Sequence, residues 1–404
     1  MYDYKRIKNV HLEPSSLCNA ECPVCNRRLS GGPKNPIMIE RCITLDEFKE
    51  WFSVDFLKQL DQLILCGNYG DPMTSPHLID ILSYFREVNP IGFISMNTNA
   101  SGRDKKFWKD LSEIIGKYGR VVFSVDGLKD TNHLYRKGTN WKKIMDAMTS
   151  FMSTKKAKAE WEFLVFEHNQ HQISEARGLA KELGMTEFWP KKAMGFNDVG
   201  KESIKREIQV LDHDGRLDYK IYAPDDRWKN ESLLKKVYKE TETNDNRTVV
   251  LQDVSNSFDY SIKIKESMNW LDEEIINKLD SCDISCASLE IQTEKGNDWQ
   301  TIFVDSTGLV FPCCFTGGKY YAGNSFETLQ FREFVESFGE DTIRLNKNNN
   351  IEKIIQSDIM KKGYVDRWNK SSTKEGKLFT CSTFCGKNIN DEIRSTKNSI
   401  GGWV

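Results

Sequence analysis

Short apolar runs alternate with amphipathic stretches from residue 9 to about residue 190, and the pattern repeats about every 30 residues. The apolar runs predict strands at residues 9–13, 62–66, 92–96, 121–125, 161–166 and 187–189. Several of these runs are apolar throughout, which is typical of a parallel sheet covered on both faces. The alternation therefore predicts an α/β fold built from six βα units.

Signals for helix ends agree with this scheme. Thr44 and Glu47 have the spacing of a capping box ahead of an apolar helix face. Ser75 and Pro76 place a proline at a first helical position, and Gly184 is suited to ending the helix before the sixth strand.

The pattern changes near residue 195, and this change divides the chain. We expect a first domain over residues 1–195 and a polar linker or insertion over residues 196–280. A second compact unit over residues 281–390 contains six of the 11 cysteines, and residues 391–404 form a tail.

Composition narrows the classes of function. The chain has 57 Lys and Arg residues and 59 Asp and Glu residues. Its net charge is therefore too small to attract it to nucleic acid or to an anionic membrane. The start of the chain has no apolar secretion signal, and no later apolar run is long enough to span a bilayer. We therefore expect a cytoplasmic protein whose cysteines bind metal rather than form disulfides.

Three cysteines follow the first predicted strand directly: Cys18, Cys22 and Cys25. Four-iron clusters are normally held by one cysteine thiolate per iron, so three cysteines leave one iron without a protein ligand. A small molecule with an amine and a carboxylate could chelate that iron. The alternative is a structural zinc site, which requires a fourth ligand from elsewhere in the chain.

Polar, turn-forming residues follow the next strands at the same end. In barrels of βα units the carboxyl ends of the strands carry the chemistry, because the loops meet there. A plain loop role is the more common explanation for any one such segment, but here they align over successive strands. They are Gly70-Asp71-Pro72, Thr98-Asn99, Ser124 with Asp126, and Glu167-His168-Asn169.

The cysteine triad resembles the signature of the radical S-adenosylmethionine (SAM) superfamily, and the resemblance covers roughly residues 8 to 190. Gly70-Asp71-Pro72 is similar to the family's Gly-Glu-Pro stretch, which binds the SAM amino group. Thr98-Asn99-Ala100 resembles Thr-Asn-Gly, and Ser124 and Asp126 resemble the segment near the SAM ribose and carboxylate. Arg136 falls where many relatives place an arginine that faces the SAM carboxylate, although a surface salt bridge is an alternative.

The resemblance implies a partial (βα)6 TIM-like barrel and a specific chemistry. Cys18, Cys22 and Cys25 would hold a catalytic [4Fe-4S] cluster that SAM completes. Reductive cleavage of SAM would yield a 5′-deoxyadenosyl radical that abstracts hydrogen from the substrate. An external one-electron reductant such as flavodoxin or ferredoxin would supply the electron.

The second group of cysteines surrounds a predicted hairpin over residues 299–314, in which Gly308 precedes Cys313 by five positions. Either zinc or a second cluster fits such a group chemically. The region resembles the SPASM and twitch extensions of radical SAM enzymes, which carry auxiliary clusters. On this resemblance we expect one auxiliary [4Fe-4S] cluster, with Cys282 or Cys314 able to replace one of its ligands. The expected ligands are Cys286, Cys313, Cys381 and Cys385.

The remaining candidates are single side chains. Cys42 and Cys66 are most simply buried apolar residues, but a thiol at Cys66 could donate hydrogen to a substrate radical. Tyr135 and His168 could relay protons near the mouth of the barrel.

The sequence leaves the substrate open. By analogy with the resembled family, the substrate is a peptide or protein side chain, and the alternative is a small molecule such as a sugar or an aminocyclitol. A non-catalytic zinc-binding module that binds RNA is a third hypothesis, which the balanced charge disfavours.

Overall fold

The computed structural model describes residues 2–193, 196, 198–199, 203–204, 207–225, 273–289, 291–292, 298–322 and 325–387. Residues 226–272 of the predicted linker and the predicted tail 391–404 lie outside these ranges.

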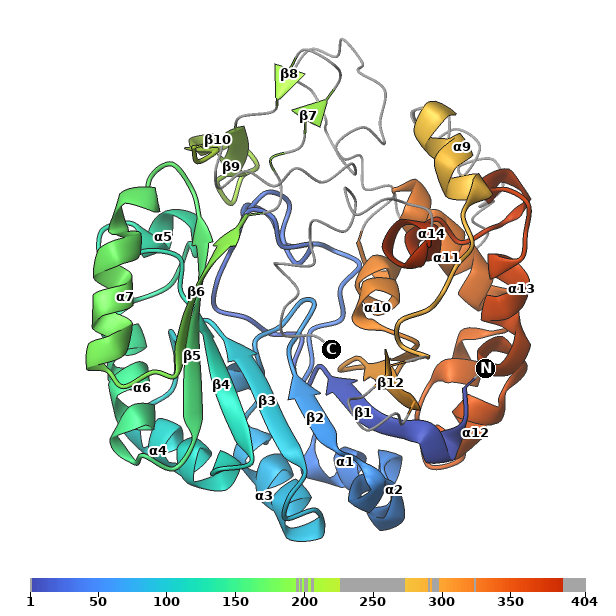
Figure 1. Ribbon diagram of the computed structural model, residues 1–404, viewed down its shortest axis with the longest axis horizontal. Helices are drawn as coiled ribbons and strands as arrows, with labels where there is room; N and C mark the ends of the chain where they lie inside the picture. The colour runs from blue at the N-terminus through green and yellow to red at the C-terminus, as the bar shows by residue number, and fades with distance from the viewer. Residues whose placement is uncertain are drawn as a thin grey trace.

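The six predicted strands are confirmed, and they form one parallel sheet in chain order (Figure 1). Their ends differ from the prediction by a few residues, because pairing with a neighbour extends a strand beyond its apolar run. The strands are β1 (Ile7–Leu12), β2 (Gln62–Leu65), β3 (Phe93–Thr98), β4 (Gly119–Ser124), β5 (Lys158–Val165) and β6 (Glu187–Lys192).

Helices cover the outer side of the curved sheet, as Figure 1 shows for α3, α4, α6 and α7. Positions in β5 alternate between buried and half-buried, because its inner face lines the interior of the barrel. The prediction of cover on both faces is therefore too simple. The helices are α1 (Leu45–Trp51), α2 (Val54–Gln59), α3 (Leu78–Val88), α4 (Lys105–Ile115), α5 (Asn132–Tyr135), α6 (Trp141–Ser153) and α7 (Ile173–Glu182).

Two of the three predicted helix ends agree with the structure. Thr44 and Glu47 form the capping box of α1, and Gly184 has a φ of +78° just beyond α7. The proline signal misplaces the start of α3, which begins at Leu78. The preceding residues form a separate 3-10 turn, Pro72–Thr74, and the Ser75 hydroxyl accepts a hydrogen bond from the His77 amide.

The C-terminal hairpin joins the same sheet, which the sequence does not indicate. β12 (Asp298–Val304) pairs in parallel with β1, and β13 (Val310–Phe311) turns back on it after Gly308, whose φ is +88°. The short strand β11 (Ile291–Gln292) pairs with β12 along the edge that faces away from β1. The Tyr2 hydroxyl connects the start of the chain to this hairpin, with hydrogen bonds to the carbonyls of Thr301 and Pro312 that are each 3.0 Å long. β1 is therefore an interior strand rather than an exposed edge.

The predicted polar linker contains regular structure. β9 (Glu207–Leu211) and β10 (Leu217–Tyr222) form an antiparallel hairpin, and β7 (Asp198–Val199) pairs with β8 (Ser203–Ile204). The predicted domain boundaries themselves stay predictions.

Helices from the C-terminal part of the chain pack beside β12, on the side away from β2 (Figure 1). None of the helices in the described ranges has both the length and the apolar character of a membrane span. These helices are α9 (Glu273–Ser281), α10 (Cys314–Tyr320), α11 (Phe326–Glu336), α12 (Ile351–Gln356), α13 (Tyr364–Trp368) and α14 (Phe379–Cys385).

We expect Asn89→Ala to lower the free energy of unfolding by about 3 kcal/mol, because it leaves buried backbone groups without partners. The Asn89 side chain is 5% exposed, and it donates to the carbonyls of Leu57 at 2.8 Å and Leu60 at 2.7 Å. It also accepts from the Gly92 amide at 2.8 Å. Urea unfolding measures the loss, with the exposed Asn348→Ala as control. Equal stabilities of the two variants would contradict this role.

Candidate functional site

The loop after β1 carries the three N-terminal cysteines. The Cys18 sulfur accepts a hydrogen bond from the Ala20 amide at 3.3 Å, and the Cys25 amide donates to the Cys22 carbonyl at 3.1 Å. Burial raises the pKa of Cys18 and of Cys22 to about 12, and that of Cys25 to about 11. These thiols are therefore neutral at pH 7 until a metal displaces their protons.

Hydrogen bonds tie this cysteine loop to the ends of the following strands. The Asp71 amide, after β2, donates to the Leu17 carbonyl at 2.8 Å. The Asn19 side chain donates to the carbonyl of Ser101, after β3, at 3.0 Å. The Glu21 amide donates to the carbonyl of Lys137, after β4, at 2.8 Å. The structure thus brings the polar strand ends and the cysteines together at one edge of the sheet.

Asp71, expected to bind the SAM amino group, also holds the turn after β3. One carboxylate oxygen accepts from the Thr98 hydroxyl at 2.8 Å, and the other accepts from the Asn99 amide at 2.7 Å. Burial raises the pKa of Asp71, and these hydrogen bonds oppose that shift. In the same turn Ala100 has a φ of +59°, the left-handed conformation that favours the glycine of the resembled motif.

The Asn99 side chain connects this turn to the first cysteine. Its amide nitrogen lies 3.1 Å from the Asn19 side-chain oxygen and 3.6 Å from the Cys18 sulfur. Its oxygen accepts from the Ser101 amide at 2.9 Å. Asn99 is buried, so its contacts hold Cys18 in a defined orientation.

Arg136 forms an internal ion pair rather than a surface salt bridge. Its Nε lies 2.6 Å from Oδ2 of Asp126, which is 0% exposed. The other Asp126 oxygen accepts from the Leu164 amide at 2.7 Å. Burial raises the pKa of Cys22, and the Arg136 guanidinium opposes this shift by favouring the thiolate. Ser124 ends β4 beside Glu162 of β5.

Glu13, at the end of β1, is a site residue that the sequence analysis missed. One of its oxygens accepts from the amides of Tyr69 and Gly70, each at 2.8 Å. Burial raises its pKa to about 8, against the effect of these hydrogen bonds. The sequence does carry a signal for this residue, because Glu13 is a carboxyl group placed directly after an apolar strand and before the cysteine triad.

The β9–β10 hairpin covers the cysteine loop. The Leu211 amide donates to the Ser30 carbonyl at 2.9 Å, and the Tyr219 hydroxyl donates to the Leu134 carbonyl at 2.6 Å. Ile208, Val210 and Ile221 pack in an apolar cluster that includes Tyr135 and Phe166, with Cys22 against it. The hairpin therefore excludes water from this side of the cysteines.

The two proposed proton relays lie in apolar surroundings. The Tyr135 and Phe166 rings have centroids 4.5 Å apart, and His168 stacks on Phe166 at 5.3 Å. Burial lowers the pKa of His168 to about 4. At neutral pH His168 is therefore uncharged, which disfavours a relay role for it.

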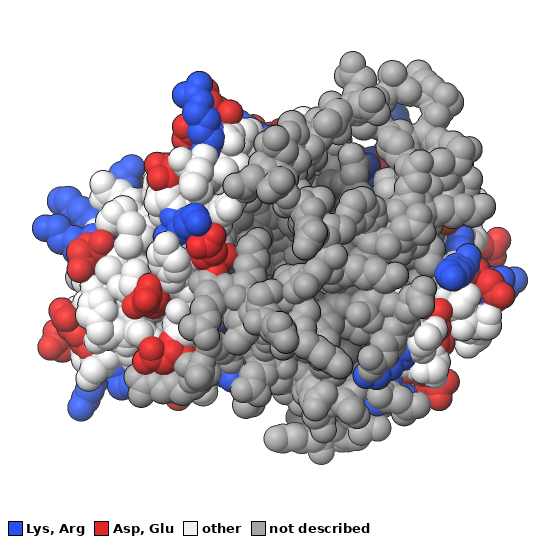
Figure 2. All heavy atoms as spheres, turned by 90° about the horizontal axis from the view of Figure 1, so that it is seen from above, with Lys and Arg blue, Asp and Glu red and all other residues white. Residues whose placement is uncertain are grey.

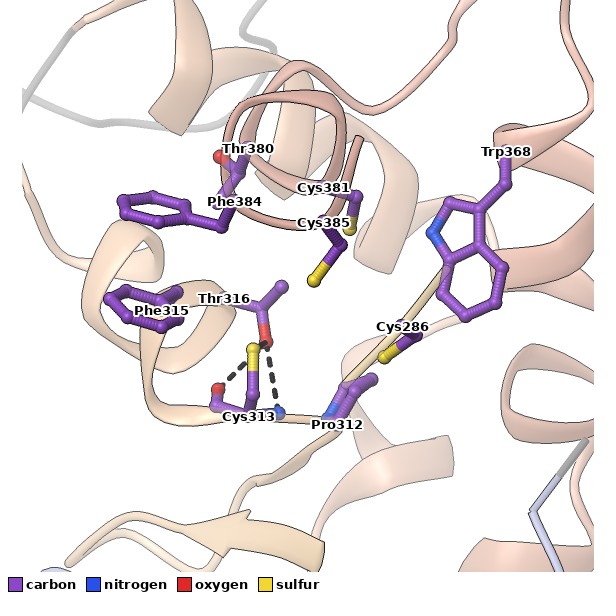
Figure 3. Close-up of a pocket in the computed structure, with 10 residues that line it drawn as sticks. All are labelled: Cys286, Pro312, Cys313, Phe315, Thr316, Trp368, Thr380, Cys381, Phe384 and Cys385. Atoms are coloured by element: carbon purple, nitrogen blue, oxygen red, sulfur yellow. Dashed lines mark hydrogen bonds between the residues drawn. The ribbon is translucent and has the colours of Figure 1, made fainter. Parts of the chain in front are cut away.

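The structure gathers four C-terminal cysteines around one pocket, the auxiliary pocket (Figure 3). Cys286 precedes the hairpin, Cys313 follows it, and Cys381 and Cys385 lie one turn apart on α14. These are the four expected ligands, whereas neither Cys282 nor Cys314 lines the pocket. The Cys282 thiol instead donates to the Leu279 carbonyl at 3.1 Å.

The donor set of each group suits an iron-sulfur cluster. A four-iron cluster takes one thiolate per iron, and the auxiliary pocket is lined by four cysteines. Stacked rings of Phe315 and Phe384, with centroids 4.0 Å apart, also line the auxiliary pocket.

The other two cysteines lie apart from both groups. The Cys42 sulfur is 3.3 Å from the Ser15 hydroxyl, which is a local structural contact. Cys66 directly follows β2 and lies near Cys314. Burial raises the pKa of Cys66, and the nearby Cys314 thiol raises it further. Hydrogen donation by Cys66 stays a prediction.

Charge is mixed on the face above these sites. Figure 2 shows acidic and basic side chains interspersed on the described part of that face. This distribution agrees with the balanced composition.

The fold and site define a partial α/β barrel with a three-cysteine loop at its strand ends and a four-cysteine pocket beside them. No protein-family model and no curated protein matches the sequence. Solved structures with a similar arrangement of the backbone do match. Streptococcus suis SuiB is 13% identical with a TM-score of 0.41, and the match covers 78% of this chain and 62% of SuiB. The chain thus spans less than two thirds of that protein's length.

Two further structures are similar. One is anSMEcpe with bound AdoMet and Cp18Cys peptide, at 15% identity and a TM-score of 0.46, covering 97% of this chain and 95% of that one. The other is BtrN in complex with AdoMet and 2-DOIA, at 19% identity and a TM-score of 0.24. That match covers 35% of this chain and 55% of the BtrN chain. Identities this low do not transfer a function, which must come from this chain's own residues.

We expect Gly70→Ala to destabilise the fold by about 3 kcal/mol or more, since a Cβ at this position overpacks two backbone segments. The added atom would lie 1.7 Å from the Ser15 carbonyl oxygen. Gly178→Ala, on α7 with nothing within 4 Å of its Cβ position, is the control and should stabilise by about 1 kcal/mol. Similar urea midpoints for both variants would refute the close approach.

Glu13→Gln should flatten the pH dependence of stability. The folded chain keeps the Glu13 proton up to about pH 8, whereas the unfolded chain loses it near 4.5. Stability is therefore full below pH 4.5 and falls as the pH rises to about 8, by at most about 1.4 kcal/mol per pH unit. Urea unfolding at about pH 5.5 and 7.5 measures this slope. The exposed Glu182→Gln should keep the wild-type slope, and an unchanged slope in Glu13→Gln would exclude the buried carboxyl as its source.

Proposed function

We propose that this chain is a radical SAM enzyme in which Cys18, Cys22 and Cys25 hold a [4Fe-4S] cluster with one open iron. The observation that carries the proposal is the set of hydrogen bonds from the cysteine loop to Asp71, Ser101 and Lys137. These bonds hold three thiols beside three successive strand ends, so a ligand of the open iron would reach polar groups of the barrel.

When bound, the reduced cluster supplies the electron that cleaves SAM to methionine and a 5′-deoxyadenosyl radical, which abstracts hydrogen from the substrate. The residues of this chain position the reactants and exclude water. Asn99 orients Cys18 through its 3.6 Å contact with the sulfur, and the Arg136 charge favours the Cys22 thiolate. The β9–β10 hairpin shields the site from solvent.

SAM would lie along the strand ends beside the open iron. Its contacts would come from Gly70-Asp71-Pro72, Thr98 with Asn99, Ser124, Asp126 and Arg136. Arg136 uses its Nε for Asp126, and a guanidinium has four further N–H donors, so Arg136 can also receive the SAM carboxylate. Asp71 can bind the amino group while it holds the β3 turn, because its Oδ2 accepts one hydrogen bond, from the Asn99 amide, and keeps a second lone pair.

The auxiliary pocket would hold one further [4Fe-4S] cluster through Cys286, Cys313, Cys381 and Cys385. Their arrangement around one pocket supports this assignment. Four thiolates complete the ligation, so this cluster would offer no open iron. It is suited to transferring electrons rather than to binding a substrate.

We propose a side chain of a peptide or protein as the substrate, with a small molecule such as a sugar or aminocyclitol as the alternative. An external one-electron donor of the flavodoxin or ferredoxin class would reduce the open cluster. Trapping 5′-deoxyadenosine formed with a deuterated candidate substrate distinguishes the two classes, because only the true substrate transfers deuterium to it.

Cys22→Ala should abolish SAM cleavage and reduce the iron content from about eight to about four per chain. The loss is confined to the open cluster because the auxiliary ligands come from another part of the chain. Anaerobic reconstitution, iron and sulfide analysis and detection of 5′-deoxyadenosine measure both effects. Cys42→Ala, which removes a thiol in contact with the Ser15 hydroxyl, is the matched control and should retain both.

Two outcomes would overturn the proposal. Tightly bound zinc without iron would indicate the structural zinc module instead. SAM cleavage that persists in Cys22→Ala would show that this loop does not hold the reactive cluster.

A further inference from the structure

Two polar side chains on α13 end in buried atoms without hydrogen-bond partners. They are the Tyr364 hydroxyl and the Trp368 indole nitrogen, neither of which makes a hydrogen bond of normal geometry within the described ranges. Burial raises the pKa of Cys381, and the indole nitrogen does lie close enough to the Cys381 sulfur to lower the pKa of that thiol against this effect. Tyr364 is 2% exposed, so water does not satisfy its hydroxyl. Burying a donor unpaired costs free energy, and native structures rarely leave two such donors one helical turn apart.

One donor, Trp368, lies at the auxiliary pocket, and the other, Tyr364, lies one turn before it on the same helix. Trp368 lines the pocket, and Figure 3 shows its indole nitrogen on the side of the ring that faces Cys381 and Cys385. Residues four apart on a helix share a face, so Tyr364 is directed toward the same side as Trp368. Burial raises the pKa of Tyr364, and the thiols of Cys381, Cys313 and Cys286 raise it further. Three of the four pocket cysteines thus lie around this ring.

A second buried tyrosine near these cysteines, Tyr2, has hydrogen-bond partners for its hydroxyl. Tyr2 is also buried near Cys286 and Cys313, but its hydroxyl donates to the carbonyls of Thr301 and Pro312 at 3.0 Å. Thr316, 3.6 Å from the Cys313 sulfur, likewise donates to the Cys313 carbonyl at 2.8 Å. Of these four side chains, Tyr364 and Trp368 are therefore the two without a hydrogen bond of normal geometry.

We propose that the Tyr364 hydroxyl and the Trp368 indole N–H donate hydrogen bonds to sulfur atoms of the auxiliary cluster and thereby raise its reduction potential. The inference rests on the proposed function, since it requires a cluster in this pocket. Sulfur atoms of a bound cluster are the acceptors that both donors lack. Hydrogen bonds to those sulfurs stabilise the reduced cluster, which carries more negative charge, so they raise the potential.

The rings are held in place independently of the cluster. Tyr364 packs edge-on against Phe334, with centroids 4.9 Å apart, and its own centroid is 6.3 Å from that of Trp368. Tyr364→Phe therefore removes one hydroxyl while it keeps this packing. Both residues are positioning residues, because they act on the cluster from outside its ligand set.

The test measures the auxiliary cluster alone. In holoprotein with Cys18, Cys22 and Cys25 changed to Ala, an EPR-monitored redox titration gives its midpoint potential. We expect Tyr364→Phe and Trp368→Phe each to shift the midpoint to more negative values, and the double variant to shift it further. Tyr2→Phe is the matched control, since its hydroxyl is bonded to backbone carbonyls, and it should leave the midpoint unchanged.

A second measurement separates this role from packing. In cluster-free protein, Tyr364→Phe should not lower the thermal unfolding midpoint, because its hydroxyl has no partner to lose in the described structure, whereas Tyr2→Phe should lower it. Unchanged potentials in both α13 variants, with four irons still bound, would overturn the inference and leave the proposed function standing. Absence of iron from the triple-alanine parent would instead overturn the auxiliary cluster itself.

Discussion

The parallel pairing of β1 with both β2 and β12 is the constraint on which the two cysteine groups depend. Leu12 is paired with Leu65 on one side and with Val304 on the other, so the three strands end at the same edge. The cysteine loop leaves that edge from β1, whereas the chain turns back after β12 and reaches Cys313 through the antiparallel strand β13. The pairing of β1 with β12 therefore determines how the segments that carry the two cysteine groups lie relative to each other.

Buried carboxylates stabilise this edge in place of apolar packing. Glu13 holds the turn after β2, Asp71 the turn after β3, and Asp126 joins Arg136 to the backbone of β5. Asp305, after β12, accepts from the amides of Thr307 and Leu309 in its own turn. Each buried carboxyl group, whether ionised or protonated as Glu13 is at neutral pH, requires hydrogen-bond partners, and these partners fix its orientation. This rigidity suits a site that must hold a cofactor and a reactive intermediate in fixed geometry.

In the proposed clusters, metal binding would be coupled to folding in both groups for the same reason. Burial raises the pKa of Cys18, Cys25 and Cys313, so the thiols of the two groups are neutral at pH 7 without metal. Thiolates form only when a metal takes the place of their protons. The apolar cover supplied by Val210 and Ile221 at one group and by Phe315 and Phe384 at the other strengthens this dependence.

The sequence by itself determined the local features. Periodicity located the six barrel strands, capping chemistry located α1, and spacing identified Cys18, Cys22 and Cys25 as one site, because all of these depend on residues close together in the chain. Only the tertiary structure decided which segments meet. It paired β12 with β1, placed the β9–β10 hairpin on the cysteine loop, and gathered Cys286, Cys313, Cys381 and Cys385 from across a hundred residues around one pocket. It also revealed Glu13, Tyr364 and Trp368, whose surroundings come from distant elements, since local pattern carries no record of long-range packing.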